Sequence, residues 1–435
     1  MPLDLRQAEA SLRTGAVARV SGHEVEVRGR RLGVGDPLVS STSAGARPAE
    51  VVAVGEHGAS ALLYADSTAL ARGDRVSRSP SGLQAVTGPS LLGRVVDALG
   101  RPIDGAGPLT ARSAPLHDAH TPPLQRRRID SPLPVGVRVI DTRCTAGRGQ
   151  RIGIFAGSGV GKSTLLGMMV RGTTADVNVI ALIGERGREV REFIEDDLGP
   201  EGLARSVVVV ATSDEPPLVR LRAGFLATAI ATGFADDGAD VLLTLDSLTR
   251  LAMAQRDVGL AAGEPPTARG YTPSVFTLLP ALLERVGPRA HGTVTGFYTV
   301  LVDGDDMNDP VADAARSILD GHLVLDRRLA HANHYPPIDP LASLSRLASK
   351  VTSPEQAAQA GAIRAALAAA EEVRDLVEVG AYVAGSNPAA DIGLAAKPAI
   401  VDFLRQRVDD LTAFDDAWGR LAAIAAACAP AEVTT

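Results

Sequence analysis

Short runs of β-forming residues fill the first part of the chain. From about residue 14 to residue 86, apolar residues that alternate or cluster at 16–20, 23–27 and 49–54 are separated by Gly-rich breaks. Several short strands at such spacing predict a small β-barrel or sandwich. The alternative for this part of the chain is an irregular region rich in loops.

The pattern changes after residue 139, where apolar strands alternate with amphipathic helical stretches up to about residue 349. Strands that alternate with helices indicate a mostly parallel sheet covered by helices on both faces. Residues 87–135 are rich in Pro and Gly, which predicts a long polar connection from one domain to the next. The predicted strands are 151–155, 177–183, 206–211, 241–245 and 293–302, and the predicted helices include 164–171, 189–197 and 217–235.

After residue 353 the sequence becomes rich in Ala and has helical spacing. Helices are expected over 354–370, 371–379 and 397–429, the last with one or two breaks. Asn387 and Pro388 mark a turn between helices, and the apolar positions are too aperiodic for a long coiled coil. The whole pattern therefore predicts an α/β core between an N-terminal β-barrel and a C-terminal helical domain.

The apolar runs, the cysteines and the net charge indicate in which compartment the protein works and which partners it can bind. No run approaches the ~18 apolar residues that a membrane span needs, and the first ten residues, MPLDLRQAEA, lack the basic region and apolar core of a secretory signal. Cys144 and Cys428 match no metal-ligand spacing and are expected to be reduced, buried thiols, so we expect a cytosolic protein. A net charge of −7 gives no basic field that would attract nucleic acid.

One lysine lies in a Gly-rich segment between a predicted strand and a predicted helix. Only three of the 44 basic residues are lysines, and Lys162 is the single one in the first 349 residues, so its site calls for an ammonium group. The segment from Ala156 reads Ala-Gly-Ser-Gly-Val-Gly-Lys-Ser-Thr, which fits a phosphate-binding loop, although the strict motif has Gly in place of Ala156. The alternative is an ordinary Gly-rich turn.

This segment has the chemistry that a nucleoside triphosphate needs. Glycines allow successive backbone N–H groups to turn toward phosphate oxygens, and the N-terminus of a helix adds partial positive charge. Lys162 supplies a compact cation to the β- and γ-phosphates, and the hydroxyl of Ser163 suits Mg²⁺. The sequence therefore predicts a site for ATP and Mg²⁺ formed by Gly157, Ser158, Gly159, Val160, Gly161, Lys162, Ser163 and Thr164.

Two carboxylates follow apolar strands downstream of this loop. Asp246 ends the strand predicted at 241–245, the usual place for the acid that holds the hydration shell of the metal ion. Glu185 follows the strand predicted at 177–183, where ligands gather in open α/β sheets, so it is the candidate for positioning and activating the attacking water. The alternatives are that Asp246 caps the next helix and that Glu185 is a solvated helix cap.

Three longer blocks resemble the flagellar protein-export ATPase, which belongs with the type III secretion ATPases and the catalytic subunits of rotary ATP synthases. The blocks are GERGREVREFIED, LDSLTRLAMAQRDVGLAAGEPPTARGYTPSVF and SILDGHLVLDRRLAHANHYPPIDPLASLSR, and the resemblance extends from about residue 15 to residue 391. It implies an N-terminal β-barrel with a short leading helix (residues 1–86), a RecA-like P-loop ATPase core with its entry linker (87–349) and a C-terminal helical domain (350–435). It also implies a ring of six copies, a homohexamer.

The resemblance implies catalytic roles for single residues. Glu185 corresponds to the catalytic glutamate of the family, Arg186 to the arginine beside it, and Asp246 to the acid of the second nucleotide motif. Arg346 corresponds to the arginine finger, which reaches the γ-phosphate bound by the neighbouring subunit. Without the resemblance, a lone arginine such as Arg346 is most simply a surface charge.

Further residues correspond to binding surfaces of the family. Tyr335 corresponds to an aromatic residue that stacks on adenine, although a packed core aromatic is the alternative, and Tyr382 is a second candidate for that pocket. Residues 257–271 match the loop that faces the central hole of the ring, where a coiled-coil central stalk protein docks. Family members carry a longer amphipathic helix before the barrel, and only about residues 3–13 remain here, which puts contact with a peripheral-stalk regulator or with lipid in doubt.

The function that the resemblance implies is ATP hydrolysis by the homohexamer, which energises or assists type III protein export for flagellar assembly. The further partners are export cargo–chaperone complexes, released at the membrane export gate. The expected location is cytoplasmic and peripheral, at the inner face of the cell membrane.

Four alternative functions are open. A virulence-type injectisome secretion ATPase has the same general features. Catalytic subunits of rotary ATP synthases carry a conspicuous acidic segment in the C-terminal domain, whereas residues 357–379 contain only scattered acids. A hexameric translocase of single-stranded nucleic acid needs aromatic stacking platforms, and the first 150 residues contain one aromatic, Tyr64. A non-catalytic nucleotide-binding scaffold typically lacks the catalytic glutamate, and Glu185 is present.

Overall fold

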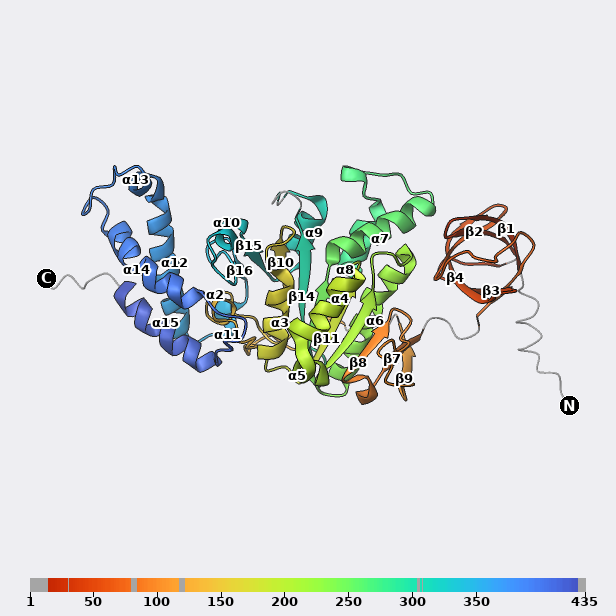
Figure 1. Cartoon of the computed structure of the whole chain (residues 1–435), viewed down its shortest axis with the longest axis horizontal. Helices are drawn as coiled ribbons and strands as arrows, with labels where there is room; N and C mark the ends of the chain where they lie inside the picture. Colours follow the sequence, from red (N-terminus) through yellow and green to blue (C-terminus); the bar gives the residue numbers. More distant parts are fainter. Residues whose placement is uncertain are drawn as a thin grey trace.

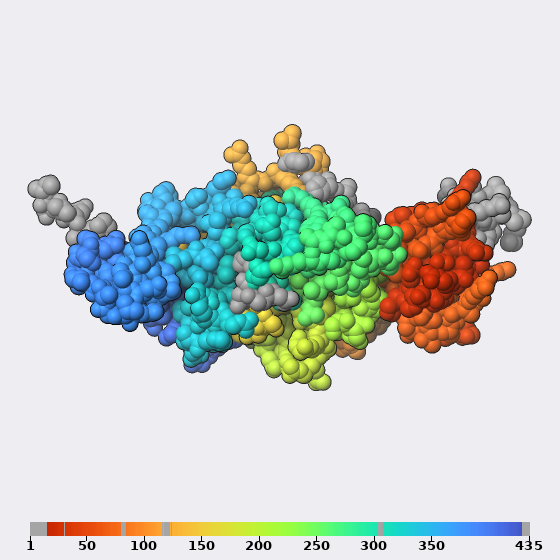
Figure 2. All heavy atoms as spheres, turned by 90° about the horizontal axis from the view of Figure 1, so that it is seen from above, coloured from red at the N-terminus to blue at the C-terminus, as the bar shows by residue number. Residues whose placement is uncertain are grey.

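The computed structural model describes residues 15–29, 31–79, 84–116, 122–302, 306 and 308–428 of the chain. Three parts lie in a row along its longest axis: a β-barrel, a sheet flanked by helices and a group of C-terminal helices (Figures 1 and 2). The predicted fold class is therefore confirmed. The leading helix expected at residues 3–13 lies outside the described residues, and the domain boundaries after residues 86 and 349 stay predictions.

Six strands close the N-terminal barrel in the order β1-β2-β5-β4-β3-β6. Alternate residues point inward, as the period of a strand requires, so Val17, Val25 and Val27 are at most 3% exposed. A closed barrel leaves no unpaired strand edge, and the alternative of an irregular region is wrong. The strands are β1 (Gly15–Ser21), β2 (Glu24–Arg28), β3 (Pro37–Thr42), β4 (Gly45–Gly55), β5 (Gly58–Leu63) and β6 (Arg75–Arg78).

The core contains an eight-stranded sheet in the order β16-β15-β10-β14-β13-β11-β12-β8. Neighbouring strands are parallel except β16, which pairs antiparallel with β15. The five predicted strands are confirmed as β10 to β14, with ends displaced by at most one residue. The strands are β8 (Arg94–Asp97), β10 (Arg151–Ala156), β11 (Val177–Ile183), β12 (Ser206–Ala211), β13 (Asp240–Asp246), β14 (Thr293–Leu301), β15 (Gly321–Leu325) and β16 (Leu344–Ser345).

The stretch predicted as a connection, residues 87–135, contributes to the sheet. Its strand β8 pairs with β12 at the sheet edge, and β7 (Gln84–Thr87) pairs with β9 (Arg112–Pro115) in a small second sheet. The prediction was wrong in this part because strands of four residues between turns are too short to show a period.

The sheet separates two apolar cores. All seven residues of β11 are buried, and they alternate, with Val179 and Ile183 in one core and Ile180 and Leu182 in the other. The first core lies under α6 (Pro217–Asp236), α7 (Leu248–Ala261), α8 (Pro273–Leu283) and α9 (Pro310–Ile318), and the second under α2 (Arg138–Arg143), α3 (Lys162–Gly172), α4 (Gly187–Glu192), the π-helical η3 (Phe193–Leu198) and α5 (Gly199–Ala204).

Helix α6 is the one helix of the described residues that is long and apolar enough to cross a membrane. Of its most apolar window, 78% is buried inside the protein. A helix that covers the centre of a sheet needs this composition, because nearly all its sides meet other apolar side chains. We therefore assign α6 to the core.

The C-terminal part is helical, as predicted. Its helices are α12 (Pro354–Glu372), α13 (Arg374–Glu378), α14 (Pro388–Leu404) and α15 (Phe414–Cys428), preceded by the short α10 (Arg327–His331) and α11 (Ala348–Val351). Helix α14 begins nine residues before the expected start, because the Asn387 side chain accepts a hydrogen bond from the Ala390 N–H and caps it. Cys144 and Cys428 are buried free thiols, as predicted.

Candidate functional site

The phosphate-binding loop joins the end of β10 to the start of α3, in the order that the sequence predicted. Gly159 and Gly161 have φ angles of 73° and 98°, which favour glycine over any residue with a Cβ. Gly161 caps α3 and Lys162 opens it, and the first turn carries no acidic residue. The unpaired N–H groups of a helix start attract an anion, so this loop can hold a phosphate.

Lys162 lies between the two predicted carboxylates. Its Nζ is 2.5 Å from Asp246 Oδ1 and 3.5 Å from Glu185 Oε1. The carboxylates come from the ends of β13 and β11, which are hydrogen-bonded neighbours in the sheet. All three side chains are largely buried, with at most 14% of each exposed. The structure therefore brings the cation, Asp246 and Glu185 together at the carboxyl edge of the sheet.

Neither carboxylate caps a helix. The N-cap of α7 is Ser247, whose side chain accepts a hydrogen bond from the Arg250 N–H at 3.2 Å. The N-cap of α4 is Arg186, and its side chain makes no capping hydrogen bond. The alternative readings of Asp246 and Glu185 as capping residues are therefore wrong.

The environment of Glu185 shifts its pKa upward. Burial raises the pKa of Glu185 above its ordinary value, the charge of Lys162 opposes this shift, and the charge of Asp246 adds to it. A carboxylate with a raised pKa accepts a proton more readily near neutral pH. Oε1 is buried and forms an ion pair with Lys162 Nζ at 3.5 Å but accepts no hydrogen bond from the described residues, so it retains capacity to accept one from a bound water.

Asp246 is also held by a threonine of the neighbouring strand β14. The Thr299 hydroxyl donates to Asp246 Oδ1 at 2.7 Å, and Thr299 is fully buried in β14, which pairs with β13. Sequence reasoning missed this residue, since its contact depends on which strands are neighbours.

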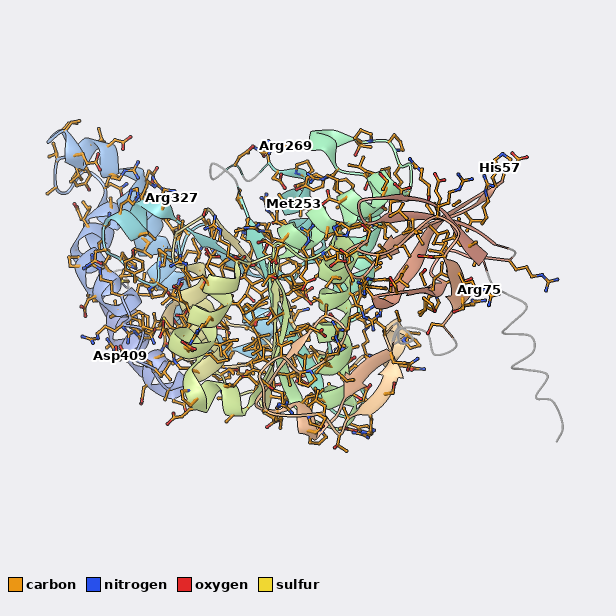
Figure 3. All side chains as sticks on the ribbon, turned by 45° about the vertical axis from the view of Figure 1, so that its right-hand side comes forward. His57, Arg75, Met253, Arg269, Arg327 and Asp409 are labelled. Atoms are coloured by element: carbon orange, nitrogen blue, oxygen red, sulfur yellow. The ribbon has the colours of Figure 1, made fainter. Side chains whose placement is uncertain are left out.

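Two arginines near the site were also missed. Arg250 packs against Gly184, where an added Cβ would lie 3.0 Å from the Arg250 Cβ, and its charge also opposes the raised pKa of Glu185 that burial causes. Arg327 donates to the carbonyl of Ser158 at 3.2 Å, from the side of the core that faces the C-terminal helices (Figure 3). The signal for Arg250 was its place four residues after Asp246, in the first turn of α7.

Tyr335 lies beside the phosphate-binding loop. An added Cβ on Gly161 would lie 3.6 Å from its ring, and 44% of the residue is exposed, so it is not a packed core aromatic. An exposed aromatic ring beside this loop suits stacking on a purine. The Tyr382 hydroxyl donates to Asp391 Oδ1 at 2.9 Å, inside the C-terminal domain, and its role at adenine stays a prediction.

The two predicted arginines lie outside this cluster. Arg186 is 75% exposed in its side chain and pairs with Glu189 at 3.3 Å. Arg346 is exposed and follows β16; its N–H donates to the Asp320 carbonyl, beside the amino end of β15. The phosphate-binding loop follows the opposite, carboxyl end of β10. The chain therefore does not bring Arg346 to its own loop.

The donor set fits Mg²⁺. Ser163 is exposed in the first turn of α3, and with Asp246 it offers the kind of oxygen donor that this hard cation takes. The described residues contain no cluster of three or more His, Cys, Asp or Glu that could hold a metal. Mg²⁺ at a nucleotide needs none, because phosphate and water supply most of its ligands.

Comparisons with known proteins find relatives over most of the chain. Residues 136–345 match the ATP synthase alpha/beta family, nucleotide-binding domain, and residues 352–423 match the T3SS EscN ATPase C-terminal domain. The flagellum-specific ATP synthase of Bacillus subtilis (strain 168) is 47% identical over 415 residues, 93% of this chain and 94% of the relative.

Two solved structures are similar along nearly the whole chain. The assembled ATPase EscN from the enteropathogenic E. coli type III secretion system is 42% identical, with a TM-score of 0.89 over 94% of this chain and 100% of that chain. EscN in complex with its central stalk EscO is 41% identical, with a TM-score of 0.87 over the same shares. The chain therefore belongs to the ATP synthase α/β family, in the group that contains flagellum-specific ATP synthases and type III secretion ATPases.

Proposed function

We propose that the chain hydrolyses Mg·ATP as a homohexameric ring that energises or assists type III protein export for flagellar assembly. The observation that carries this proposal is the position of Lys162 within 3.5 Å of both Glu185 and Asp246. A non-catalytic scaffold has no need of a buried carboxylate beside the phosphate-binding lysine.

Each residue has a role in this reaction. The loop from Gly157 to Thr164 cradles the phosphates, and Lys162 neutralises charge on the β- and γ-oxygens. Glu185 orients the attacking water and takes its proton as the bond from the water oxygen to the γ-phosphorus forms and the bond from that phosphorus to the departing oxygen of ADP breaks. Mg²⁺, when bound, offsets phosphate charge and orients the leaving group; Ser163 and Asp246 would hold it and its hydration shell.

The residues outside the cluster act at other parts of the nucleotide or on neighbouring copies. Tyr335 stacks on adenine and Arg186 lies beside the catalytic glutamate. Arg346 reaches the γ-phosphate in the neighbouring subunit. The exposed position of Arg346 at the far end of the sheet supports a role in trans, because six identical chains in a closed ring repeat one head-to-tail interface.

The partners in this proposal follow from the relatives. The ring takes a coiled-coil central stalk at residues 257–271, for which the EscN–EscO complex is the precedent, a peripheral-stalk regulator, and cargo–chaperone complexes at a membrane export gate. The location is cytoplasmic, at the inner face of the cell membrane. Nucleic acid has no part in the proposal.

A second candidate is an injectisome secretion ATPase, favoured by the likeness of the chain to EscN. A chromosomal deletion separates the two, with complementation by the wild-type chain and by Glu185→Gln. We expect the deletion to abolish motility, and only the wild-type chain to restore it. Normal motility with loss of a secreted effector would replace the flagellar role by the injectisome role. Purified protein without Mg²⁺-dependent ATP hydrolysis would overturn both.

A further inference from the structure

Thr299 lies where β14 passes the acid of the nucleotide site. In the parallel pairing of β13 with β14, Leu245 is opposite Tyr298, so Thr299 is next to Asp246. The Thr299 side chain is fully buried. Its hydroxyl is 2.7 Å from Asp246 Oδ1 and 3.4 Å from the carbonyl oxygen of Leu245. A hydroxyl has one proton to donate, and the shorter, charge-assisted bond to the carboxylate is the stronger of the two.

This hydrogen bond fixes one oxygen of the carboxylate. Lys162 Nζ and Thr299 Oγ1 both donate to Oδ1 of Asp246, and among the described residues no other side-chain donor to this carboxylate is found. The second oxygen is therefore the one that remains for the hydration shell of a metal ion. When Lys162 turns toward a phosphate, Thr299 still holds Oδ1, because its strand is fixed by pairing with β10, where Thr299 is opposite Ile154.

A neighbouring threonine shows that burial in the sheet does not by itself create such a contact. Thr244 of β13 is also fully buried, yet its hydroxyl has no hydrogen-bond partner among the described residues. A β-branched residue suits a strand whether or not its hydroxyl is used. The two threonines thus share the sheet and the burial, and differ in the contact to Asp246.

We propose that Thr299 is a positioning residue that orients Asp246 for Mg²⁺, an inference that rests on the proposed ATPase function. Partners that hold a metal-binding carboxylate typically change metal affinity by about 10–100-fold when they are removed. Asp246 meets the ion through its hydration shell in this proposal, so the lower end of that range applies. The effect belongs to Mg²⁺ affinity and not to nucleotide affinity as such.

The test compares Thr299→Val with Thr299→Ser and Thr244→Val. Val keeps the shape of Thr and removes the hydroxyl, Ser keeps the hydroxyl, and Thr244→Val makes the same change where the hydroxyl has no partner. The readouts are the Mg²⁺ concentration that half-saturates the fluorescence change of bound mant-ATP, nucleotide affinity in EDTA, and kcat and KM at saturating Mg²⁺. We expect Thr299→Val to raise the half-saturating Mg²⁺ concentration about tenfold while affinity in EDTA is unchanged.

Recovery of most of the Mg²⁺ affinity in Thr299→Ser and an unchanged Thr244→Val would support the proposal. A shift of less than about twofold in Thr299→Val, or an equal shift in Thr244→Val, would overturn it. If Thr299→Val does not fold, Thr299→Ala carries the same expectation. Failure of the ATPase function is distinguishable, because the wild-type protein would then show no Mg²⁺-dependent hydrolysis at all.

Discussion

Three charges lie close together before any ligand enters the site. Lys162 contacts two carboxylates, and the pKa of Glu185 is raised by burial and by Asp246 against the opposing charge of Lys162. A buried titratable group whose pKa is shifted by burial and by charged partners is a candidate for a functional role. At the residue scale, therefore, the sharpest predictions concern Glu185.

Glu185→Gln keeps the size of the side chain and cannot accept a proton. We expect turnover to fall by ~10²-fold or more, the range of a positioned base, while Mg·ATP still binds. Steady-state hydrolysis and mant-ATP fluorescence measure the two properties separately. The matched control is Glu195→Gln, which changes an exposed glutamate paired with Arg191 and should leave turnover as it is. A near-normal kcat in Glu185→Gln contradicts the assignment.

The pH dependence of turnover tests the same residue. A base works when it is deprotonated, so activity is lost as pH falls through its pKa, and a raised pKa moves this loss to higher pH. Since burial raises the pKa of Glu185 above 4.5, we expect the acidic limb of kcat to lie above pH 4.5. The measurement is kcat at saturating Mg·ATP, with nucleotide affinity and circular dichroism recorded at each pH. An acidic limb at or below the ordinary value speaks against a buried base.

The site was predictable from sequence as far as it is local. Lys162 and Glu185 follow the ends of strands within a few residues, and Asp246 ends a strand. Because the carboxyl ends of parallel strands lie at one edge of the sheet, the three residues could be assigned to the same edge from sequence. Thr299 could not be found this way, because its contact to Asp246 depends on β14 lying beside β13, a pairing between segments more than 50 residues apart.

At the scale of elements, the strands of the core sheet that were found from sequence are those buried on both faces. Such strands appear as continuous apolar runs, and β10 to β14 were placed within one residue at each end. The strands that were missed, β8, β15 and β16, lie toward the two edges of the sheet. Strands near the edges are short and partly exposed, so they contain too few apolar residues to show a strand period and cannot be told from turns by sequence.

The packing of α12 on α14 depends on one glycine. A Cβ on Gly393 would lie 2.2 Å from the carbonyl oxygen of Ala366, which is backbone and cannot rotate away. We expect Gly393→Ala to lower the free energy of unfolding by about 1–3 kcal/mol. Gly361→Ala on α12 is the control, because nothing lies within 4 Å of its added Cβ, and it should be neutral or stabilise by up to about 1 kcal/mol. Urea denaturation followed by circular dichroism measures both, and equal stabilities would contradict this packing.

At the scale of the whole molecule, Arg138 connects the core to the C-terminal helices. It is 3% exposed, and its guanidinium donates to the Phe403 carbonyl at 2.7 Å, to the Arg405 carbonyl, and to Asp410 at 2.7 Å. The first two are carbonyls that the end of α14 leaves without helical partners. Gln406, which follows Arg405, donates its backbone N–H to the Tyr335 carbonyl at 2.8 Å. The helical domain is therefore hydrogen-bonded directly to Tyr335, the residue beside the phosphate-binding loop.

One chain contains both parts of the proposed catalytic site, the phosphate-binding loop and the arginine finger Arg346, but holds them at opposite ends of the sheet. The phosphate-binding loop follows the carboxyl end of β10, whereas Arg346 is exposed near the amino end of β15. If Arg346 serves a neighbour, Arg346→Ala should bind ATP and hydrolyse it ~10³–10⁵-fold more slowly, the effect of an arginine finger. Specific activity of the wild-type protein should also rise with concentration as rings assemble.

Mixing two inactive variants decides whether Arg346 acts in trans. In rings that contain Arg346→Ala and Lys162→Ala chains, some interfaces pair an intact phosphate-binding loop with an intact finger, so activity should partly return. The control mixes Lys162→Ala with Glu185→Gln, whose defects fall in the same site, so no interface is complete and activity should stay absent. Mixed rings are verified by mass spectrometry of tagged chains. If the first mixture restores nothing although mixed rings form, or if isolated monomers turn over at the full rate, Arg346 is not a finger for its neighbour.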